Sequence, residues 1–222
     1  IYLFDNLNLI TSPSFWIFGG DGWAYDIGFG GLDHVVASGE NVNILILDTE
    51  VYSNTGGQTS KSTPRGATAK FNMAGKETKK KDLASMLMTY KDVYVAQVSM
   101  GANPDQCVQA FVEAEAYDGP SVIIAYSPCV NHGYNLRESR NHEQLAMRSG
   151  YNTLFRYNPN NTQPMTVDSF EPTENYEDYV ETENRFAILK KVNPSKKDKL
   201  IKASKLDAIE RRKTYLNKQK EK

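Results

Sequence analysis

Four short apolar runs, each followed by glycine or polar residues, constrain the fold of this chain more than any other feature. They are residues 15–18, 42–47, 93–98 and 121–126. Apolar runs of this length are typical of strands that are buried on both faces of a sheet. The segments between the runs are long enough to hold helices. The sequence therefore predicts an α/β fold, with a parallel sheet, right-handed crossovers and helices on both faces.

Helix start and stop signals support this alternation. Asn103 can cap a helix, Pro104 suits its first position, Gln106 completes a capping box, and Gly119 follows its end. Residues 82–90 are expected to form a shorter helix. These signals place helices before the third and the fourth apolar runs.

A glycine-containing helix is expected at residues 24–38, where His34 should lie on the buried side without a catalytic role. Three glycines in this segment would permit close packing on the sheet. They are Gly28, Gly30 and Gly31.

The chain changes character after about residue 135. A helix is predicted at residues 138–148, followed by an Asn- and Pro-rich stretch at 157–164 and an acidic stretch at 168–183. This pattern predicts a division into a sheet domain, residues 1–135, and a mostly helical C-terminal extension, residues 136–222, that adds no strands to the sheet.

The lysine-rich end of the chain has apolar residues at roughly helical spacing, which predicts a terminal amphipathic helix with a solvated charged face. The apolar positions are Leu200, Ile201, Leu206, Ile209 and Tyr215.

Charge and cysteine content exclude several classes of protein. The formal net charge is -1, so no basic surface for nucleic acid is expected. No apolar run approaches the roughly 18 residues of a membrane span, so we expect a soluble protein without a membrane partner. Two cysteines are too few for a disulfide framework and suggest a reducing compartment. Because the chain begins with Ile1 rather than Met, we expect it to be part of a longer polypeptide.

Polar residues follow the first two runs, where the predicted strands end. Gly20-Asp21-Gly22 follows the first run, and residues 48–54 follow the second. The carboxyl ends of strands are where open α/β sheets bind ligands. The glycines would let backbone amides approach a diphosphate, and the helix after Trp23 would direct its positive end toward it.

The same two segments can supply a magnesium ion with oxygen ligands. Mg²⁺ prefers near-octahedral oxygen coordination and retains phosphate and water ligands. Asp21 offers a carboxylate, Thr49 a hydroxyl and Val51 a main-chain carbonyl. Taken alone, Gly-Asp-Gly after a strand is also common in ordinary strand-to-helix turns. Both interpretations stay open on these residues.

Two other phosphate-binding motifs are excluded by inspection. A dinucleotide fingerprint needs a third glycine where Tyr25 stands, and a P-loop needs a glycine at Lys70 before Gly75-Lys76. The glycine-rich turn after the first run therefore belongs to neither motif.

Three longer stretches, residues 19–28, 48–58 and 63–67, carry a family resemblance. They resemble the diphosphate-binding domain of pyruvate:ferredoxin (flavodoxin) oxidoreductases. The resemblance covers most of residues 15–134, and the tail around 154–159 resembles the same family more loosely.

The resemblance implies thiamine diphosphate bound through Mg²⁺, with Asp21, Thr49 and the Val51 carbonyl as protein ligands of the metal. Asn54 would be catalytic, its amide steadying a developing oxyanion, whereas from the residues alone it is equally well a turn residue. Asp48-Thr49 argues against transketolases and simple decarboxylases, which carry asparagine at the second position. The implied cofactor-binding residues are Gly20, Asp21, Gly22, Trp23, Thr49, Glu50, Val51, Tyr52, Ser53 and Asn54.

A second cofactor is implied at Cys129. A lone cysteine after a strand is more often a small buried hydrophobe. Residues 128–133, Pro-Cys-Val-Asn-His-Gly, nevertheless resemble the position that supplies the last thiolate of a 4Fe-4S iron-sulfur cluster, with the other three thiolates coming from upstream. A zinc site formed by Cys129 and His132 is disfavoured. Cys107, the other cysteine, lies inside a predicted helix as a core residue and gives no matching pair of ligands.

Two further sites are left open. Some relatives hold a calcium ion at the positions of Asn41, Asn43 and Ser121, and the uncharged Asn41 argues against Ca²⁺ here. Lys61 and Arg65 either reach an anionic substrate or phosphate, or lie in a solvated loop.

The resemblance implies an enzyme of anaerobic metabolism, a pyruvate:ferredoxin oxidoreductase. Such an enzyme oxidatively decarboxylates pyruvate to acetyl-CoA and CO₂ and passes electrons through iron-sulfur clusters to ferredoxin or flavodoxin. Residues 1–135 would be its thiamine diphosphate and magnesium domain (the diphosphate half). The implied partners are pyruvate, coenzyme A, ferredoxin or flavodoxin, upstream domains of the same enzyme, and a second subunit of a homodimer. The isolated segment would be inactive, and the compartment cytoplasmic, or hydrogenosomal in an anaerobic eukaryote.

Three alternatives remain. The first is the same domain in a pyruvate:NADP oxidoreductase or another 2-oxoacid oxidoreductase, the second a non-oxidative thiamine lyase, and the third a noncatalytic α/β binding module. The first shares this whole segment, so the residues alone do not separate it from the ferredoxin-linked enzyme.

Overall fold

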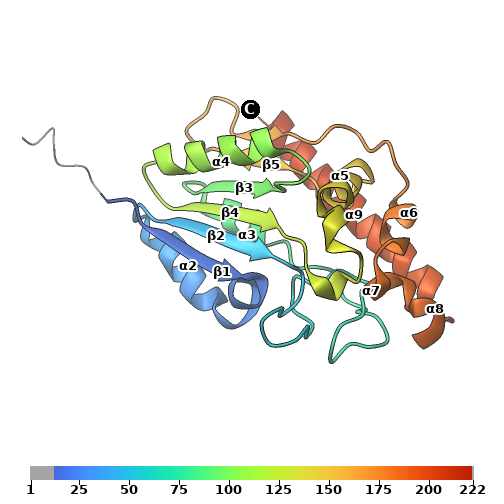
Figure 1. The fold of residues 1–222 in the computed structure, drawn as a ribbon. Coiled ribbons are helices and arrows are strands. Elements are labelled where there is room, and N and C mark those ends of the chain that lie inside the picture. The colour runs from blue at the N-terminus through green and yellow to red at the C-terminus, as the bar shows by residue number, and fades with distance from the viewer. Residues whose placement is uncertain (1–12, 222) are drawn as a thin grey trace, which may run out of the picture.

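One six-stranded sheet forms the centre of the computed structural model, which describes residues 13–221 (Figure 1). The expectations for residues 1–12 lie outside the described residues. The strand order in the sheet is β1-β2-β4-β3-β5-β6. The strands are β1 (Trp16–Gly20), β2 (Asn43–Asp48), β3 (Tyr94–Val98), β4 (Ser121–Tyr126), β5 (Phe155–Tyr157) and β6 (Met165–Val167).

The four predicted strands are confirmed. β1, β2, β4 and β3 pair in parallel, in that order. β1 lies at the edge, and its Phe18 is 65% exposed. Most apolar side chains of the inner strands are buried on both sides of the sheet: Ile44 and Ile46 of β2 point into one core, and Leu45 points into the other. This two-sided burial is why the runs are nearly continuous rather than alternating.

The expectation that no strand follows residue 135 is wrong. β5 pairs antiparallel with β3, and β6 pairs antiparallel with β5, so the sheet is mixed. The Asn- and Pro-rich residues 158–164 make the turn of this hairpin. Strands of three residues are too short to show an alternating pattern, which explains why the sequence does not reveal them. The division at residue 135 stays a prediction.

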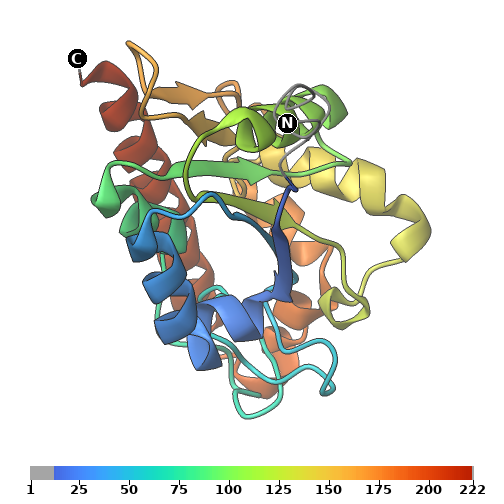
Figure 2. The same ribbon diagram turned by 90° about the vertical axis from the view of Figure 1, so that its left-hand side faces the viewer.

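Helices cover both faces of the sheet (Figure 2). α2 (Phe29–Ser38), α3 (Leu83–Leu87) and Tyr215 of α9 (Lys197–Lys220) pack on one face. α4 (Pro104–Ala116) packs on the other through Cys107, Ala110 and Ala114. The predicted layered α/β architecture is therefore confirmed.

The predicted helix at residues 24–38 is divided in two. A π-helical turn, η2 (Gly22–Ile27), comes first, and α2 begins at Phe29. A Cβ on Gly28 would lie 2.1 Å from the Trp23 ring, so this glycine is needed for that contact rather than for packing on the sheet. A Cβ on Gly30 or Gly31 would meet no atom within 4 Å, so the expected close packing at these two glycines is wrong. The expected buried position of His34 is also wrong, because this residue is exposed.

The N-terminus of α4 confirms half of the predicted capping box. The Asn103 side chain accepts a hydrogen bond from the Gln106 backbone N–H at 3.1 Å. The Gln106 side chain does not reach back; it donates to the Gln97 carbonyl at 3.3 Å and to Asp168 at 3.2 Å. The second half of the box is lost because Gln106 joins the helix to β3 and to the segment after β6. At residues 82–90, α3 continues into the 3₁₀ turn η3 (Met88–Tyr90).

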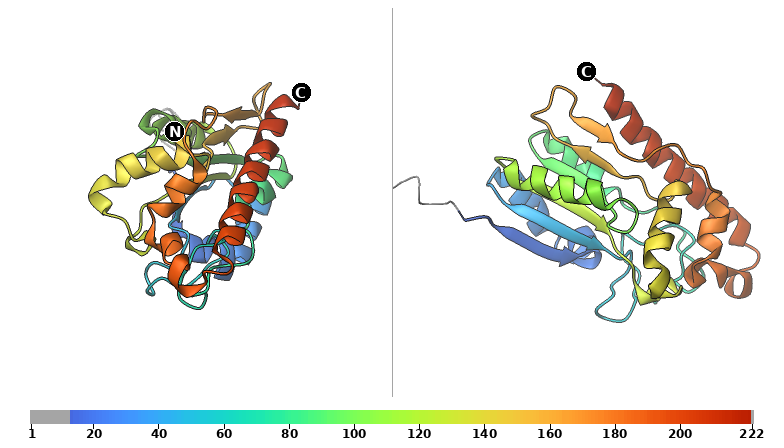
Figure 3. Two further views of the ribbon diagram at one scale, coloured as in Figure 1. Left: turned by 90° about the vertical axis from the view of Figure 1, so that its right-hand side faces the viewer. Right: turned by 45° about the horizontal axis from the view of Figure 1, so that its top comes forward.

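Short helices and α9 build a second core beyond the carboxyl ends of the strands (Figure 3). These short helices are α5 (Ser139–Arg148), α6 (Tyr176–Glu181), α7 (Asn184–Ala187) and α8 (Leu189–Val192). Two 3₁₀ turns, η4 (Val130–His132) and η5 (Leu136–Glu138), precede α5. The terminal helix is confirmed as α9, and its Leu200, Ile201 and Tyr215 are buried. Leu206 and Ile209 are instead exposed. None of the helices at residues 13–221 is both long and apolar enough to span a bilayer.

Candidate cofactor site

The turn after β1 is shaped by close contacts at its glycines. Asp21 is 1% exposed and precedes the first turn of η2. A Cβ on Gly22 would lie 2.4 Å from the Tyr52 ring, so only glycine fits beneath that ring. A Cβ on Gly20 would meet nothing within 4 Å, which leaves open space beside the backbone where β1 ends. This space suits the close approach of a ligand to main-chain groups.

Four oxygen-bearing groups from the two predicted segments converge next to this turn. The Thr49 hydroxyl lies 3.0 Å from Asp21 Oδ1, 3.1 Å from the Val51 carbonyl and 2.8 Å from the Ser53 hydroxyl. Ser60 donates to the other Asp21 oxygen at 2.6 Å. The predicted juxtaposition of Asp21, Thr49 and the Val51 carbonyl is therefore present in the structure.

The chemistry of these groups fits a hard divalent cation. Burial, reinforced by the nearby charge of Asp48, raises the pKa of Asp21 to about 7. Lys80 offsets this rise only in part, so a cation bound at this point would further stabilise the ionised form of Asp21. No group of three or more His, Cys, Asp or Glu side chains that could hold a metal occurs among residues 13–221. A Mg²⁺ ion held largely by phosphate and water does not require such a group.

Cys129 lies directly beside this oxygen cluster. Its sulfur is 3.1 Å from the Ser53 hydroxyl, 3.5 Å from the Asn131 backbone nitrogen and 3.4 Å from the Asn131 side-chain nitrogen. The residue is 7% exposed and follows β4. Polar groups of Ser53 and Asn131 therefore surround this sulfur.

A family model matches the part of the chain that contains the first two site segments. The model described as "Thiamine pyrophosphate enzyme, C-terminal TPP binding domain" matches residues 10–125. This span is more than half of the chain and contains both the Asp21 turn and the Thr49 loop. The chain belongs to this family.

Several proteins similar to this thiamine pyrophosphate enzyme domain are 2-oxoacid oxidoreductases by name. It is 53% identical over 210 residues to the pyruvate:ferredoxin oxidoreductase of Moorella thermoacetica, covering 93% of the chain and 18% of that protein. The pyruvate-flavodoxin oxidoreductase of Klebsiella pneumoniae is 53% identical over 212 residues, with the same shares covered. The mitochondrial pyruvate dehydrogenase [NADP(+)] of Euglena gracilis is 50% identical over 208 residues, 91% of the chain and 11% of that protein.

Among solved structures, the domain is similar to a 2-oxoglutarate:ferredoxin oxidoreductase from Magnetococcus marinus. That structure contains 2-oxoglutarate, coenzyme A and succinyl-CoA. The match has 28% identity and a TM-score of 0.47 and covers 50% of this chain and 38% of that chain. The domain spans about a fifth of the length of the bacterial curated relatives named above.

The other residues expected at the thiamine site occupy different environments. Trp23 is partly buried and fills the space between Gly19 and Gly28. Asn54 is exposed in the turn that follows Ser53. Glu50 is 2% exposed and hydrogen-bonds to Lys80, Arg185 and Tyr151, so its carboxylate is not available to a cofactor.

The loop cations Lys61 and Arg65 both have protein partners. Lys61 pairs with Asp26 at 3.2 Å, and Arg65 pairs with Asp207 at 2.7 Å. Lys61 is exposed, in keeping with a solvated loop, whereas Arg65 is partly buried.

The residues of the doubtful calcium site also contact protein groups. The Asn41 and Asn43 side-chain amides donate to Asp118 and Glu115, each at 3.3 Å, and the Ser121 hydroxyl donates to the Ala114 carbonyl. Buried Asn43 Oδ1 has no hydrogen-bond partner in the part of the chain that the structure describes.

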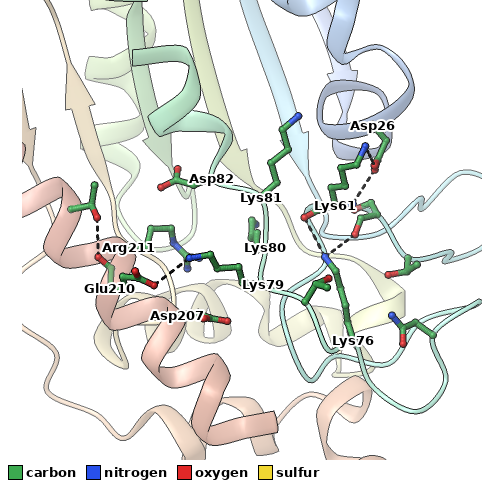
Figure 4. A pocket seen from close by; sticks show the side chains of 15 residues that line it. Asp26, Lys61, Lys76, Lys79, Lys80, Lys81, Asp82, Asp207, Glu210 and Arg211 are labelled. Atoms are coloured by element: carbon green, nitrogen blue, oxygen red, sulfur yellow. Dashed lines mark hydrogen bonds and ion pairs between the residues drawn. The ribbon is translucent and has the colours of Figure 1, made fainter. Parts of the chain in front are cut away.

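A cavity of about 650 Å³ adjoins the thiamine site but does not include Asp21, Thr49 or Val51 in its lining (Figure 4). Five lysines, one arginine and four carboxylates line it. Lys79 pairs with Glu210 at 3.4 Å, while the Lys76 ammonium donates to three loop carbonyls, the shortest being Thr63 at 2.6 Å. Most of the charged side chains that line the cavity therefore already contact other protein groups.

The sequence does not reveal several residues that support the site. Ser60 contacts Asp21, and buried His132 contacts the Thr49 carbonyl at 2.8 Å. Lys80 reaches Asp48 at 2.6 Å, and Arg185 reaches Glu50 at 2.7 Å. Lys80 lies in a lysine run that resembles a solvated face, and Arg185 lies far along the chain, so neither carries a local signal of burial.

Proposed function

We propose that this chain is the diphosphate-anchoring part of a pyruvate:ferredoxin or pyruvate:flavodoxin oxidoreductase, which converts pyruvate to acetyl-CoA and CO₂. The observation that carries the proposal is the continuous contact from Asp21 through Thr49 and Ser53 to Cys129. A thiamine-metal site and a potential cluster ligand are adjacent in this arrangement. That adjacency is what a thiamine enzyme needs if electrons are to leave the cofactor.

Asp21, the Thr49 hydroxyl and the Val51 carbonyl would hold Mg²⁺, and the open backbone at Gly20 would face the diphosphate. Thiamine diphosphate, when bound, supplies the electron sink for decarboxylation. Asn54 follows Ser53 directly and is exposed. Its side-chain amide would donate to an oxyanion on the substrate.

Cys129 would provide one thiolate of a 4Fe-4S cluster. Support comes from the polar groups around its sulfur, which are the Ser53 hydroxyl and the two nitrogens of Asn131. The other three thiolates would come from other domains of the same enzyme, because Cys107 is buried in the core under α4.

Pyruvate and the electron acceptors in the proposal follow the names of the relatives, whereas coenzyme A, the homodimer and the compartment follow the family resemblance of the sequence. Pyruvate and coenzyme A would be substrates, and ferredoxin or flavodoxin would accept electrons from an assembled homodimer in the cytoplasm, or in a hydrogenosome of an anaerobic eukaryote. The Euglena relative favours a second candidate, a pyruvate:NADP oxidoreductase built on the same domain. Comparing reduction of ferredoxin and of NADP⁺ by the assembled enzyme distinguishes these two.

Substitution of Cys129 tests the proposal. In the assembled enzyme, Cys129→Ser should abolish pyruvate-dependent reduction of a viologen dye, while Mg²⁺-dependent binding of thiamine diphosphate stays at the wild-type level. Cys107→Ala, in the other cysteine, should retain dye reduction. A Cys129→Ser enzyme that reduces the dye at the wild-type rate would favour a thiamine enzyme without a cluster at this point. A wild-type enzyme that binds no thiamine diphosphate would indicate a noncatalytic module.

A further inference from the structure

Glu50 sits between two expected metal-binding residues and adopts an unusual backbone conformation. Its φ is 61°, in the left-handed region, which is unfavourable for a residue with a long side chain. Its neighbours in the chain supply the Thr49 hydroxyl and the Val51 carbonyl. The direction of both oxygens therefore depends on the conformation at Glu50.

Every polar group of Glu50 is held by the surrounding protein. The backbone N–H donates to Asp48 at 3.1 Å, and the carbonyl accepts from the Thr63 hydroxyl at 2.5 Å. Lys80 lies 2.8 Å from one carboxylate oxygen, while Arg185 at 2.7 Å and the Tyr151 hydroxyl at 2.5 Å contact the other. A strained conformation persists when its surroundings determine it this completely.

Arg185 ties this turn to the C-terminal part of the chain. Its side chain is 1% exposed and also bonds to Glu183 at 2.7 Å through Nε. Its backbone carbonyl accepts from both the N–H and the hydroxyl of Thr68, at 2.8 Å and 2.9 Å. The guanidinium thus bridges two buried carboxylates from a fixed main chain, a geometry that lysine cannot reproduce.

We infer that Glu50, Tyr151 and Arg185 are positioning residues for the metal-diphosphate site. They act through the backbone: the buried carboxylate fixes the turn, and the turn presents the Thr49 hydroxyl and the Val51 carbonyl to the metal. The inference rests on the proposed function, since it assumes that Mg²⁺ binds these two oxygens. Through Tyr151 and Arg185, the segment after residue 135 influences the affinity of the site for its cofactor.

The experiment measures the Mg²⁺ affinity of the assembled enzyme at saturating thiamine diphosphate, by quenching of protein fluorescence. Arg185→Lys keeps the positive charge but cannot contact Glu50 and Glu183 at the same time. Tyr151→Phe removes only the hydroxyl that contacts Glu50. We expect the dissociation constant for Mg²⁺ to rise by about 10- to 100-fold in Arg185→Lys, and by less in Tyr151→Phe. Excess Mg²⁺ should restore kcat in both variants, because the catalytic groups are untouched.

Arg212→Lys is the matched control. Arg212 is also buried, at 8% exposed, but its carboxylate partner is Glu171, at 3.2 Å, and not Glu50. This variant should keep the wild-type Mg²⁺ affinity even if its melting temperature falls.

The inference is overturned if folded Tyr151→Phe and Arg185→Lys bind Mg²⁺ as the wild type does, or if kcat falls without recovery at high Mg²⁺. Should Arg185→Lys not fold, Tyr151→Phe decides. A wild-type enzyme that binds thiamine diphosphate without needing Mg²⁺ contradicts the proposed function instead, so the two failures are distinguishable.

Discussion

The hydroxyl oxygen of Ser53 lies 3.1 Å from the sulfur of Cys129, although 76 positions separate them in the chain. The same hydroxyl lies 2.8 Å from the hydroxyl of Thr49. One side chain therefore joins the expected metal ligand at the end of β2 to the expected cluster ligand after β4. In the proposed function, this contact would join the cofactor site to the first step of electron transfer.

Removing the Ser53 hydroxyl should change the cluster. Hydrogen bonds to a ligating sulfur stabilise the reduced cluster, which carries more negative charge, so their loss lowers the reduction potential. We expect Ser53→Ala to shift the midpoint potential of the cluster to a more negative value, measured by EPR-monitored redox titration of the assembled enzyme.

Ser127→Ala is the control for this substitution, because its hydroxyl bonds to the Ala125 carbonyl at 3.0 Å and not to Cys129. Equal potentials in Ser53→Ala, Ser127→Ala and the wild type would show that Ser53 does not influence a cluster at Cys129.

The two glycines of the turn after β1 should respond differently to alanine. Gly22→Ala places a methyl group 2.4 Å from the Tyr52 ring, and overpacking of this kind costs about 1–3 kcal/mol of unfolding free energy. Gly20→Ala meets no protein atom within 4 Å. It should leave the melting temperature unchanged but weaken thiamine diphosphate binding. Thermal denaturation and cofactor titration of both variants check this, and a Gly20→Ala enzyme with full affinity would place the diphosphate elsewhere.

The buried carboxylate of Glu183 should make the protein sensitive to acid. Burial alone would raise its pKa, but the Arg185 guanidinium and the hydrogen bond from His142 outweigh burial and hold the pKa at about 2, below the ordinary 4.5. Because the folded-state pKa is the lower one, the stabilisation is complete above about pH 4.5 and is lost as the pH falls toward 2. Urea denaturation at a series of pH values should show this loss in the wild type.

Glu183→Gln should lower the unfolding free energy at neutral pH and flatten its fall in acid. Glu181→Gln is the control, since this glutamate is 39% exposed and pairs with surface lysines. Identical acid dependence in Glu183→Gln and the wild type would contradict the stabilising role assigned to the ionised carboxylate.

The strands and the central site residues could be predicted because their signals are local. Each apolar run forms a strand, and the three inner strands are buried on both faces. Asp21 and Thr49 follow two adjacent parallel strands, which brings them to one edge of the sheet. The Asn103 cap is a signal of the same local kind and is present.

The parts that could not be predicted depend on tertiary contacts. β5 and β6 have three residues each and gain their stability by pairing at the edge next to β3. Lys80 is largely shielded from solvent because Asp48 and Glu50 compensate its charge. Arg185 is buried because Glu50 and Glu183 compensate its charge. A sequence pattern records charge but not the partner that allows a charge to be buried.

The metal-diphosphate site itself is tested most directly by titrating thiamine diphosphate and Mg²⁺ into the cofactor-free assembled enzyme by calorimetry. Asp21→Asn keeps the shape of the side chain, and Asp26→Asn, in the same turn, serves as the matched variant because Asp26 pairs with Lys61. We predict that Asp21→Asn lowers the Mg²⁺-dependent affinity for thiamine diphosphate by more than about 100-fold. This loss is larger than the one typical of residues that contact a metal only through its ligands. Asp26→Asn should bind as the wild type does. Equal affinity of Asp21→Asn and the wild type would contradict the account.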